Sequence, residues 1–184
     1  MTDRDSAADK GWLLLVYRVP SEPSRLRAAV WRRLKGLGAI YLQNSAAALP
    51  AGGGAERALR KLRSQILDMG GTAALMSCTV LAGEAEVRAA FEAARNDEYE
   101  EILDRCDDFL VQVKKEYLAD HFTFAELEEN EVDLAKLRSW FARVRQRDAF
   151  GATGRPAAEK GLDSCQQVLD EYAARVYAEQ AESD

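Results

Sequence analysis

Apolar residues near the start of the chain change from a continuous run to a helical spacing. The run Trp12 to Val19 is rich in aromatic and β-branched residues and ends before a proline, which favours a buried strand. Over 25–37, leucine and valine recur every three or four residues, and Gly38 follows where a helix commonly ends. Ser21 or Ser24 is the expected N-cap. The pattern predicts a strand followed by a helix.

A hairpin, a second helix and a last strand are expected next. Short apolar stretches at 39–43 and 46–49 flank Asn44-Ser45, which has the length of a tight turn. Residues 55–69 repeat the helical spacing, and residues 72–81 have the pattern of a strand. The resulting order is β-α-β-β-α-β. This is the ferredoxin-like arrangement, an antiparallel four-stranded sheet with two helices on one face.

The remainder of the chain has a helical pattern. One helix is expected as far as Tyr117, with Asn96-Asp97 as a candidate interruption. Thr123 and Glu126 have the spacing of a capping box and begin another helix. Glycine and proline at 150–156 indicate a turn before the last helix. The final two helices are therefore expected to pack as an antiparallel αα-hairpin.

These patterns divide the chain into three parts. Residues 1–11 are a polar tail, 12–82 a basic ferredoxin-like domain, and 83–184 an acidic helical extension. The predicted fold class is α+β.

Charge separates the two main parts. The net charge is −6, but residues 1–82 hold 12 Lys and Arg against 6 Asp and Glu, while residues 83–184 hold 13 against 25. Between 10 and 70 the ratio is 11 basic to 3 acidic. Such an asymmetry indicates a part that binds a polyanion, joined to a part with another role. The alternative is a charge match inside the molecule, in which the basic helices face the acidic ones.

The cations cluster on the two helices of the basic domain. At 100° per residue, the cations of the first helix lie opposite its apolar stripe or at the borders of that opposite side. Trp31 lies near the border of this basic side and is expected to be half-packed. Arginine suits phosphate oxygens and guanine edges. The candidate DNA contacts are Arg18, Arg25, Arg27, Arg32, Arg33, Lys35, Arg57, Arg60, Lys61 and Arg63.

Enzymatic function is not expected. The chain has one histidine, His121, and no nucleophile elbow, Walker loop or dinucleotide-binding glycine motif. The acidic clusters at 97–108 and 126–133 are expected to be solvated helix faces, so no metal or cofactor is predicted. Cys78, Cys106 and Cys165 have no close spacing and are interpreted as small buried apolar residues.

A cytoplasmic protein is expected. The first ten residues are polar and acidic, unlike a signal peptide. The longest apolar run is far shorter than the roughly 20 residues that span a bilayer.

Two long segments resemble one known family. The run from Trp12 to Ser45, LLLVYRVPSEPSRLRAAVWRRLKGLGAIYLQN between those ends, is similar to the N-terminal domain of the chromate-resistance protein ChrB. The segment from Phe122 to Arg155 and the closing Ala173 to Tyr177 also resemble that domain. More loosely, the first half resembles the ferredoxin-like module of PaaX-type repressors and Cas2-like proteins.

The resemblance implies a DNA-binding transcriptional regulator of a chromate-efflux operon, released from its promoter by chromate. It assigns DNA contacts to the basic first helix. Full-length members carry a further C-terminal domain associated with chromate sensing. The resemblance therefore leaves open whether this chain or that further domain responds to chromate. The stretch Asn44 to Gly54 is also smaller and richer in alanine than the family pattern. Cas2-like nucleases have an acidic residue at the end of the first strand, whereas this chain has Tyr17-Arg18-Val19, which disfavours a nuclease.

Three functions follow from these observations. The leading hypothesis is a regulator that binds operator DNA as a homodimer. The alternatives are a chromate or oxyanion sensor in which the same arginines bind the small dianion, and a protein–protein interaction module.

Overall fold

The computed structural model describes residues 11–183 of the 184-residue chain. Most of the predicted polar tail, residues 1–10, lies outside the described residues. The chain forms two compact units, Met1–Ala94 and Arg95–Asp184. Each unit has its own hydrophobic core. The mixed α and β composition and the helical C-terminal part that the sequence predicts are confirmed.

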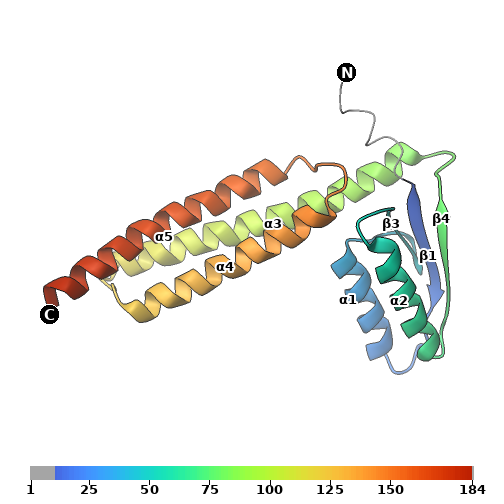
Figure 1. Ribbon diagram of the computed structural model, residues 1–184, viewed down its shortest axis with the longest axis horizontal. Coiled ribbons are helices and arrows are strands. Elements are labelled where there is room, and N and C mark those ends of the chain that lie inside the picture. The colour runs from blue at the N-terminus through green and yellow to red at the C-terminus, as the bar shows by residue number, and fades with distance from the viewer. Residues whose placement is uncertain (1–10, 184) are drawn as a thin grey trace, which may run out of the picture. The chain divides into compact units, whose positions relative to one another are not determined.

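In the first unit, an antiparallel sheet carries two helices on one face (Figure 1). The strands lie in the order β2-β3-β1-β4. In chain order the elements are β1 (Trp12–Arg18), α1 (Arg25–Leu37), β2 (Ile40–Gln43), β3 (Ala46–Pro50), α2 (Ala55–Asp68) and β4 (Thr72–Cys78).

Alternating residues of the central strand separate the two faces of the sheet. Leu13 and Leu15 of β1 are buried in one cluster with Leu34 of α1 and Leu59 of α2. Val16, one position further along β1, is exposed. This is the period-2 pattern expected of a strand with one covered face.

Trp12 is buried away from the two helices. Its ring meets that of Phe91 edge-on, with centroids 6.1 Å apart. Phe91 lies in the first turns of α3 (Glu84–Leu118), which the contacts assign to the first unit. An aromatic edge contact of this kind adds to the stabilisation from apolar burial.

Turns and caps of the first unit agree with the sequence except at one serine. Asn44 and Ser45 form the predicted turn, with Ser45 at φ 67°, and Gly38 ends α1 at φ 79°. Ser24 precedes α1 in a helical conformation and makes no side-chain capping bond. The cap predicted there is therefore absent. In its place, the Leu26 N–H bonds the Pro23 carbonyl at 3.0 Å.

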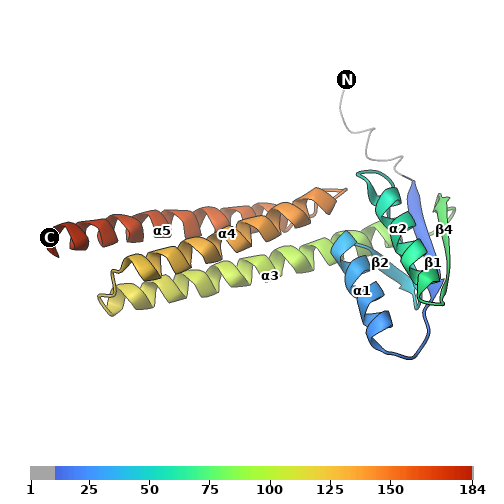
Figure 2. The same cartoon turned by 60° about the horizontal axis from the view of Figure 1, so that its bottom comes forward.

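Three helices build the second unit: the later part of α3, α4 (Phe124–Arg147) and α5 (Arg155–Ser183). α4 and α5 run side by side in opposite directions, as the predicted αα-hairpin requires (Figure 2). The Thr123 hydroxyl accepts a hydrogen bond from the Glu126 N–H at 3.3 Å, so the predicted cap of α4 is confirmed.

α3 is one continuous helix, and the interruption expected at Asn96-Asp97 is wrong. The Asn96 side chain has a different role. Its Oδ1 accepts a hydrogen bond from the Gly154 N–H at 2.8 Å, next to the start of α5. Asparagine favours helix breaks because its amide competes for nearby backbone groups. Here that amide is used by a backbone group 58 residues away.

Candidate nucleic-acid interface

The basic residues of α1 surround a narrow apolar stripe. Val30 and Leu34 are buried, and by the 100° rotation per residue Arg25, Arg32 and Lys35 lie on the opposite side. These three side chains are exposed. α1 contains no acidic residue, so its cations have no partner of opposite charge within the helix. The helix therefore presents uncompensated positive charge to its surroundings.

Trp31 lies among these cations. Half of its surface is exposed, 50%, and the Lys35 ammonium is 5.4 Å from the centre of its ring. The rotation along α1 places Arg27 on the same flank. An aromatic ring with flanking cations is the combination by which proteins stack on bases and hold phosphates. Sequence reasoning placed Trp31 at the border of the basic face but did not include it in the site.

A groove between α1 and α2 brings two more cations together. It has a volume of about 420 Å³, and Arg33 of α1 and Lys61 of α2 line it over an apolar floor that includes Val30 and Leu62. Asp68 lines the same groove. The two helices lie next to each other on the sheet (Figure 1), so the groove joins their basic faces.

The remaining cations of α2 differ in their contacts. Arg57 is exposed on the outer side of the helix. Arg60 forms an ion pair with Glu56 at 2.7 Å. The Arg63 Nε donates to the backbone carbonyl of Ala73 in β4 at 3.1 Å. Arg57 therefore extends the basic face of α1, whereas Arg60 is partly neutralised and Arg63 is held towards the edge of the sheet.

Arg18 is separated from the other predicted contacts. It ends β1 and is exposed. Counting along the strand, it shares a face with Trp12 and Val16, opposite the face on which Leu13 and Leu15 pack against the helices. The candidate interface is therefore the surface of α1 and α2, and we call it the basic face: Arg25, Arg27, Trp31, Arg32, Arg33, Lys35, Arg57 and Lys61.

Two phenols lie on the helix-bearing side of the sheet. The hydroxyls of Tyr17 and Tyr41 are 3.1 Å apart. Partial burial, followed by this hydrogen bond, raises the pKa of Tyr41. A phenol that stays neutral keeps its proton and can donate to a phosphate oxygen.

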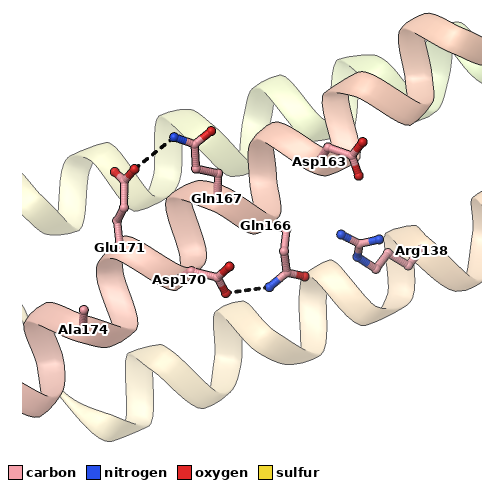
Figure 3. Close-up of a pocket in the computed structure, with 7 residues that line it drawn as sticks. All are labelled: Arg138, Asp163, Gln166, Gln167, Asp170, Glu171 and Ala174. Atoms are coloured by element: carbon pink, nitrogen blue, oxygen red, sulfur yellow. Dashed lines mark hydrogen bonds between the residues drawn. The ribbon is translucent and has the colours of Figure 1, made fainter.

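The second unit contains an open cleft between α4 and α5, with polar residues along its walls (Figure 3). Arg138 extends from α4 towards side chains of α5. On α5, Gln166 donates to Asp170 at 2.8 Å and Gln167 donates to Glu171 at 3.2 Å. These pairs run along one helix and do not converge on a common point, so we do not place the functional site here.

Acidic residues of the second unit form ion pairs within it. Glu98 is paired with Arg95 at 3.0 Å and also with Arg147, which connects α3 to the end of α4. Among residues 11–183, no cluster of three or more histidine, cysteine, aspartate or glutamate side chains is placed to hold a metal ion. None of the described helices is both long and apolar enough to cross a membrane.

The structure also brings together two cysteines that looked unrelated in the sequence. Cys106 of α3 and Cys165 of α5 are both fully buried, and the Cys165 Sγ is 3.5 Å from the Cys106 carbonyl oxygen. Each occupies the apolar stripe of its helix, which is the signal available in the sequence. That signal does not say which two helices meet.

Comparison with known proteins identifies the family. The model of the family described as "Protein ChrB, N-terminal" matches residues 27–183. A protein of Cupriavidus metallidurans named Protein ChrB is 35% identical over 98 residues, which are 52% of this chain and 30% of that relative. The match thus spans less than a third of the relative's length. The family resemblance seen in the sequence is confirmed, and the chain belongs to the ChrB N-terminal family.

Proposed function

We propose that this chain is a DNA-binding transcriptional regulator of a chromate-resistance operon, without enzymatic activity, acting in the cytoplasm as a homodimer. Its family relates to chromate resistance. The proposed contacts with DNA are made by the basic face of α1 and α2. The strand order β2-β3-β1-β4 supports the ferredoxin-like class for the first unit.

The observation that carries this proposal is the charge of α1. Five cations lie on 13 residues, no acid lies between them, and all five are exposed. A helix of this length is about 20 Å long, since each residue adds about 1.5 Å. Such a surface attracts phosphates, and its binding to DNA would weaken steeply as salt is added.

The exposed tryptophan supports nucleic acid over a small anion as the ligand. Trp31 offers an apolar ring beside Lys35. A small anion such as phosphate has no flat apolar surface that could pack on this ring. A nucleic acid supplies both a charged backbone and flat bases or sugars.

The experiment is fluorescence anisotropy of the full chain with labelled DNA from its own upstream region, across a salt series. The test variant is Arg32→Ala combined with Arg33→Ala, which changes one outward cation and one groove cation. Each phosphate contact contributes about 0.9 to the slope of log affinity against log salt, so losing both lowers that slope by about 2. Affinity should fall at every salt concentration.

The matched control is Arg143→Ala combined with Arg145→Ala. Both arginines are exposed on α4 in the second unit, so the change in net charge is the same. This control should bind DNA as the unaltered chain does. Unchanged binding by a folded Arg32 and Arg33 variant, or an equal loss in the control, would refute the assignment to the basic face.

A second candidate function has one specific observation in its favour. The groove between α1 and α2 brings Arg33 and Lys61 to the same place, and two convergent cations suit a small dianion such as chromate. Asp68 in that groove opposes anion binding, which is why we rank this function second. Calorimetry with chromate and sulfate on the unaltered chain and on Lys61→Ala tests it. Heat that disappears in the variant supports the oxyanion site, and no heat in the unaltered chain rejects it.

A further inference from the structure

Two thiols from different helices meet in the core of the second unit. Cys106 and Cys165 are separated by 59 residues, and neither exposes any surface to solvent. The Cys165 Sγ lies 3.5 Å from the backbone oxygen of Cys106.

A glycine permits the close approach of the two helices. Gly161 lies one turn before Cys165 on α5. A Cβ added at Gly161 would be 2.8 Å from the Leu103 Cδ1, 3.4 Å from the Cys106 Cβ and 3.5 Å from the Cys106 Sγ. The backbone of α5 is therefore close to the Cys106 side chain, as a bond between the helices would require.

The two thiols are not equivalent. The neighbouring Cys165 thiol lowers the pKa of Cys106, while burial opposes the effect. The same contact, together with burial, raises the pKa of Cys165. The thiolate is the reactive form of cysteine, so the pair contains one favoured nucleophile and one neighbour that keeps its proton.

We propose that Cys106 and Cys165 are a redox modification site, which peroxides convert to a reversible disulfide between α3 and α5. This site is independent of DNA binding by the basic face. Because neither sulfur is exposed, oxidation requires a transient local opening of the helices. The disulfide then joins α3 and α5 covalently within the second unit.

The reaction balances with one peroxide for each pair. The Cys106 thiolate attacks a peroxide oxygen, an S–O bond forms, the O–O bond breaks, and hydroxide leaves and takes up the proton that Cys106 had lost. The Cys165 sulfur then attacks the sulfenic sulfur of Cys106. The S–S bond forms, the S–O bond breaks, and the hydroxyl leaves with the Cys165 proton as water. Two thiols lose two electrons, and hydrogen peroxide becomes two waters.

The experiment treats the full chain with hydrogen peroxide, then denatures it and alkylates the remaining thiols. The chain has three cysteines, so alkylatable thiols should fall from three to one. Mass spectrometry should show the loss of two hydrogen atoms and a linked peptide pair containing Cys106 and Cys165. Dithiothreitol should restore all three thiols.

The variants separate this pair from the third cysteine. Cys78→Ala should still form the link and retain no alkylatable thiol after oxidation. Cys106→Ala should retain both remaining thiols, whereas Cys165→Ala should form no link and should stop at the sulfenic acid of Cys106. Three alkylatable thiols after peroxide, a link that includes Cys78, a link between two chains, or oxidation that dithiothreitol does not reverse would each overturn the proposal. The peptide map of the unaltered chain needs no variant, so a variant that fails to fold does not affect the test.

Discussion

Asn130 of α4 donates a hydrogen bond through Nδ2 to the Glu116 Oε2 of α3, and the two atoms are 2.7 Å apart. Both residues are almost fully buried, at 4% and 6% exposure. The Gln112 amide donates to the other carboxylate oxygen at 3.0 Å. A buried carboxylate that is satisfied by two amides fixes how the helices align, because a shift of α4 would leave the carboxylate without its partner.

Replacing the partner should therefore cost stability. In Asn130→Leu, the Glu116 carboxylate stays buried with one hydrogen bond fewer, which destabilises the second unit by about 2–3 kcal/mol. Adding Glu116→Leu to that variant should recover part of the loss, since both polar groups are then removed. Urea unfolding of the three chains measures this, and a double variant less stable than the single one would contradict it.

Two glycines of the first unit should respond in opposite ways to alanine. A Cβ at Gly71 would clash with the Arg18 carbonyl oxygen and lie 2.9 Å from the Ile66 backbone oxygen. Gly36, within α1, has open space around it. We expect Gly71→Ala to destabilise the first unit by about 2 kcal/mol or more, and Gly36→Ala to stabilise it by about 0.5–1 kcal/mol. Thermal unfolding followed by circular dichroism checks both. Equal changes in stability for the two variants would show that steric crowding does not determine the effect of alanine at Gly71.

The ring of Trp31 should contribute to DNA affinity. We expect Trp31→Ala to weaken DNA binding roughly five- to tenfold, corresponding to about 1 kcal/mol or slightly more, and to leave the melting temperature nearly unchanged because the ring is half exposed. Trp31→Phe should retain part of the affinity, since it keeps an aromatic face. Trp140→Phe is the control in the second unit. Full affinity in a folded Trp31→Ala chain would remove this residue from the interface.

Alkaline pH should weaken the second unit through Tyr172. Its hydroxyl donates to the His121 carbonyl oxygen at 2.5 Å, and burial, with the nearby Glu116 carboxylate next, raises the pKa of Tyr172 to about 12 from an ordinary 10.0. A pKa raised by folding means that this stabilisation is complete below about pH 10 and is lost as the pH rises towards 12.

The comparison with Tyr172→Phe isolates this effect. Near neutral pH the variant should be less stable by about 1 kcal/mol, since it lacks the hydrogen bond. The difference should shrink above about pH 10, because Tyr172 ionises there in the unfolded form of the unaltered chain while it stays neutral in the folded form. Urea midpoints of both chains near pH 8 and near pH 11 measure this. A difference that stays constant over that interval would contradict the assignment to Tyr172.

Local patterns in the sequence were sufficient for most of the elements. The apolar run at the start of β1, the turn at Asn44-Ser45 and the Thr123 cap of α4 each depend on residues close together in the chain, and the structure contains all three. One error, the missing cap at Ser24, is local, since the Leu26 N–H bonds the nearby Pro23 carbonyl instead. The other occurred where a distant group decides the outcome. The amide of Asn96 does not end its own helix, because it accepts a hydrogen bond from Gly154.

The candidate site was predictable in part for the same reason. The charge of α1 and the side on which Arg25, Arg32 and Lys35 lie follow from helical rotation alone. The place of Arg18 could not be found from the sequence, because residues 12–16 of β1 are all apolar and only the structure shows which alternate residues face the helices. The cysteine pair could not, since local periodicity does not show that α3 meets α5 at Cys106 and Cys165.

The positions of the tryptophans give this chain three separate optical reporters. Trp12 is 3% exposed in the core of the first unit, Trp31 lies on the basic face, and Trp140 packs partly buried against the core of the second unit. Single-tryptophan versions of the chain would emit from one of these surroundings at a time. The cations near Trp31 should concentrate an anionic quencher such as iodide. The ratio of Trp31 quenching to Trp140 quenching should therefore be larger with iodide than with a neutral quencher. Unfolding of each unit, and occupation of the basic face, could then be followed in the same cuvette without attaching a dye.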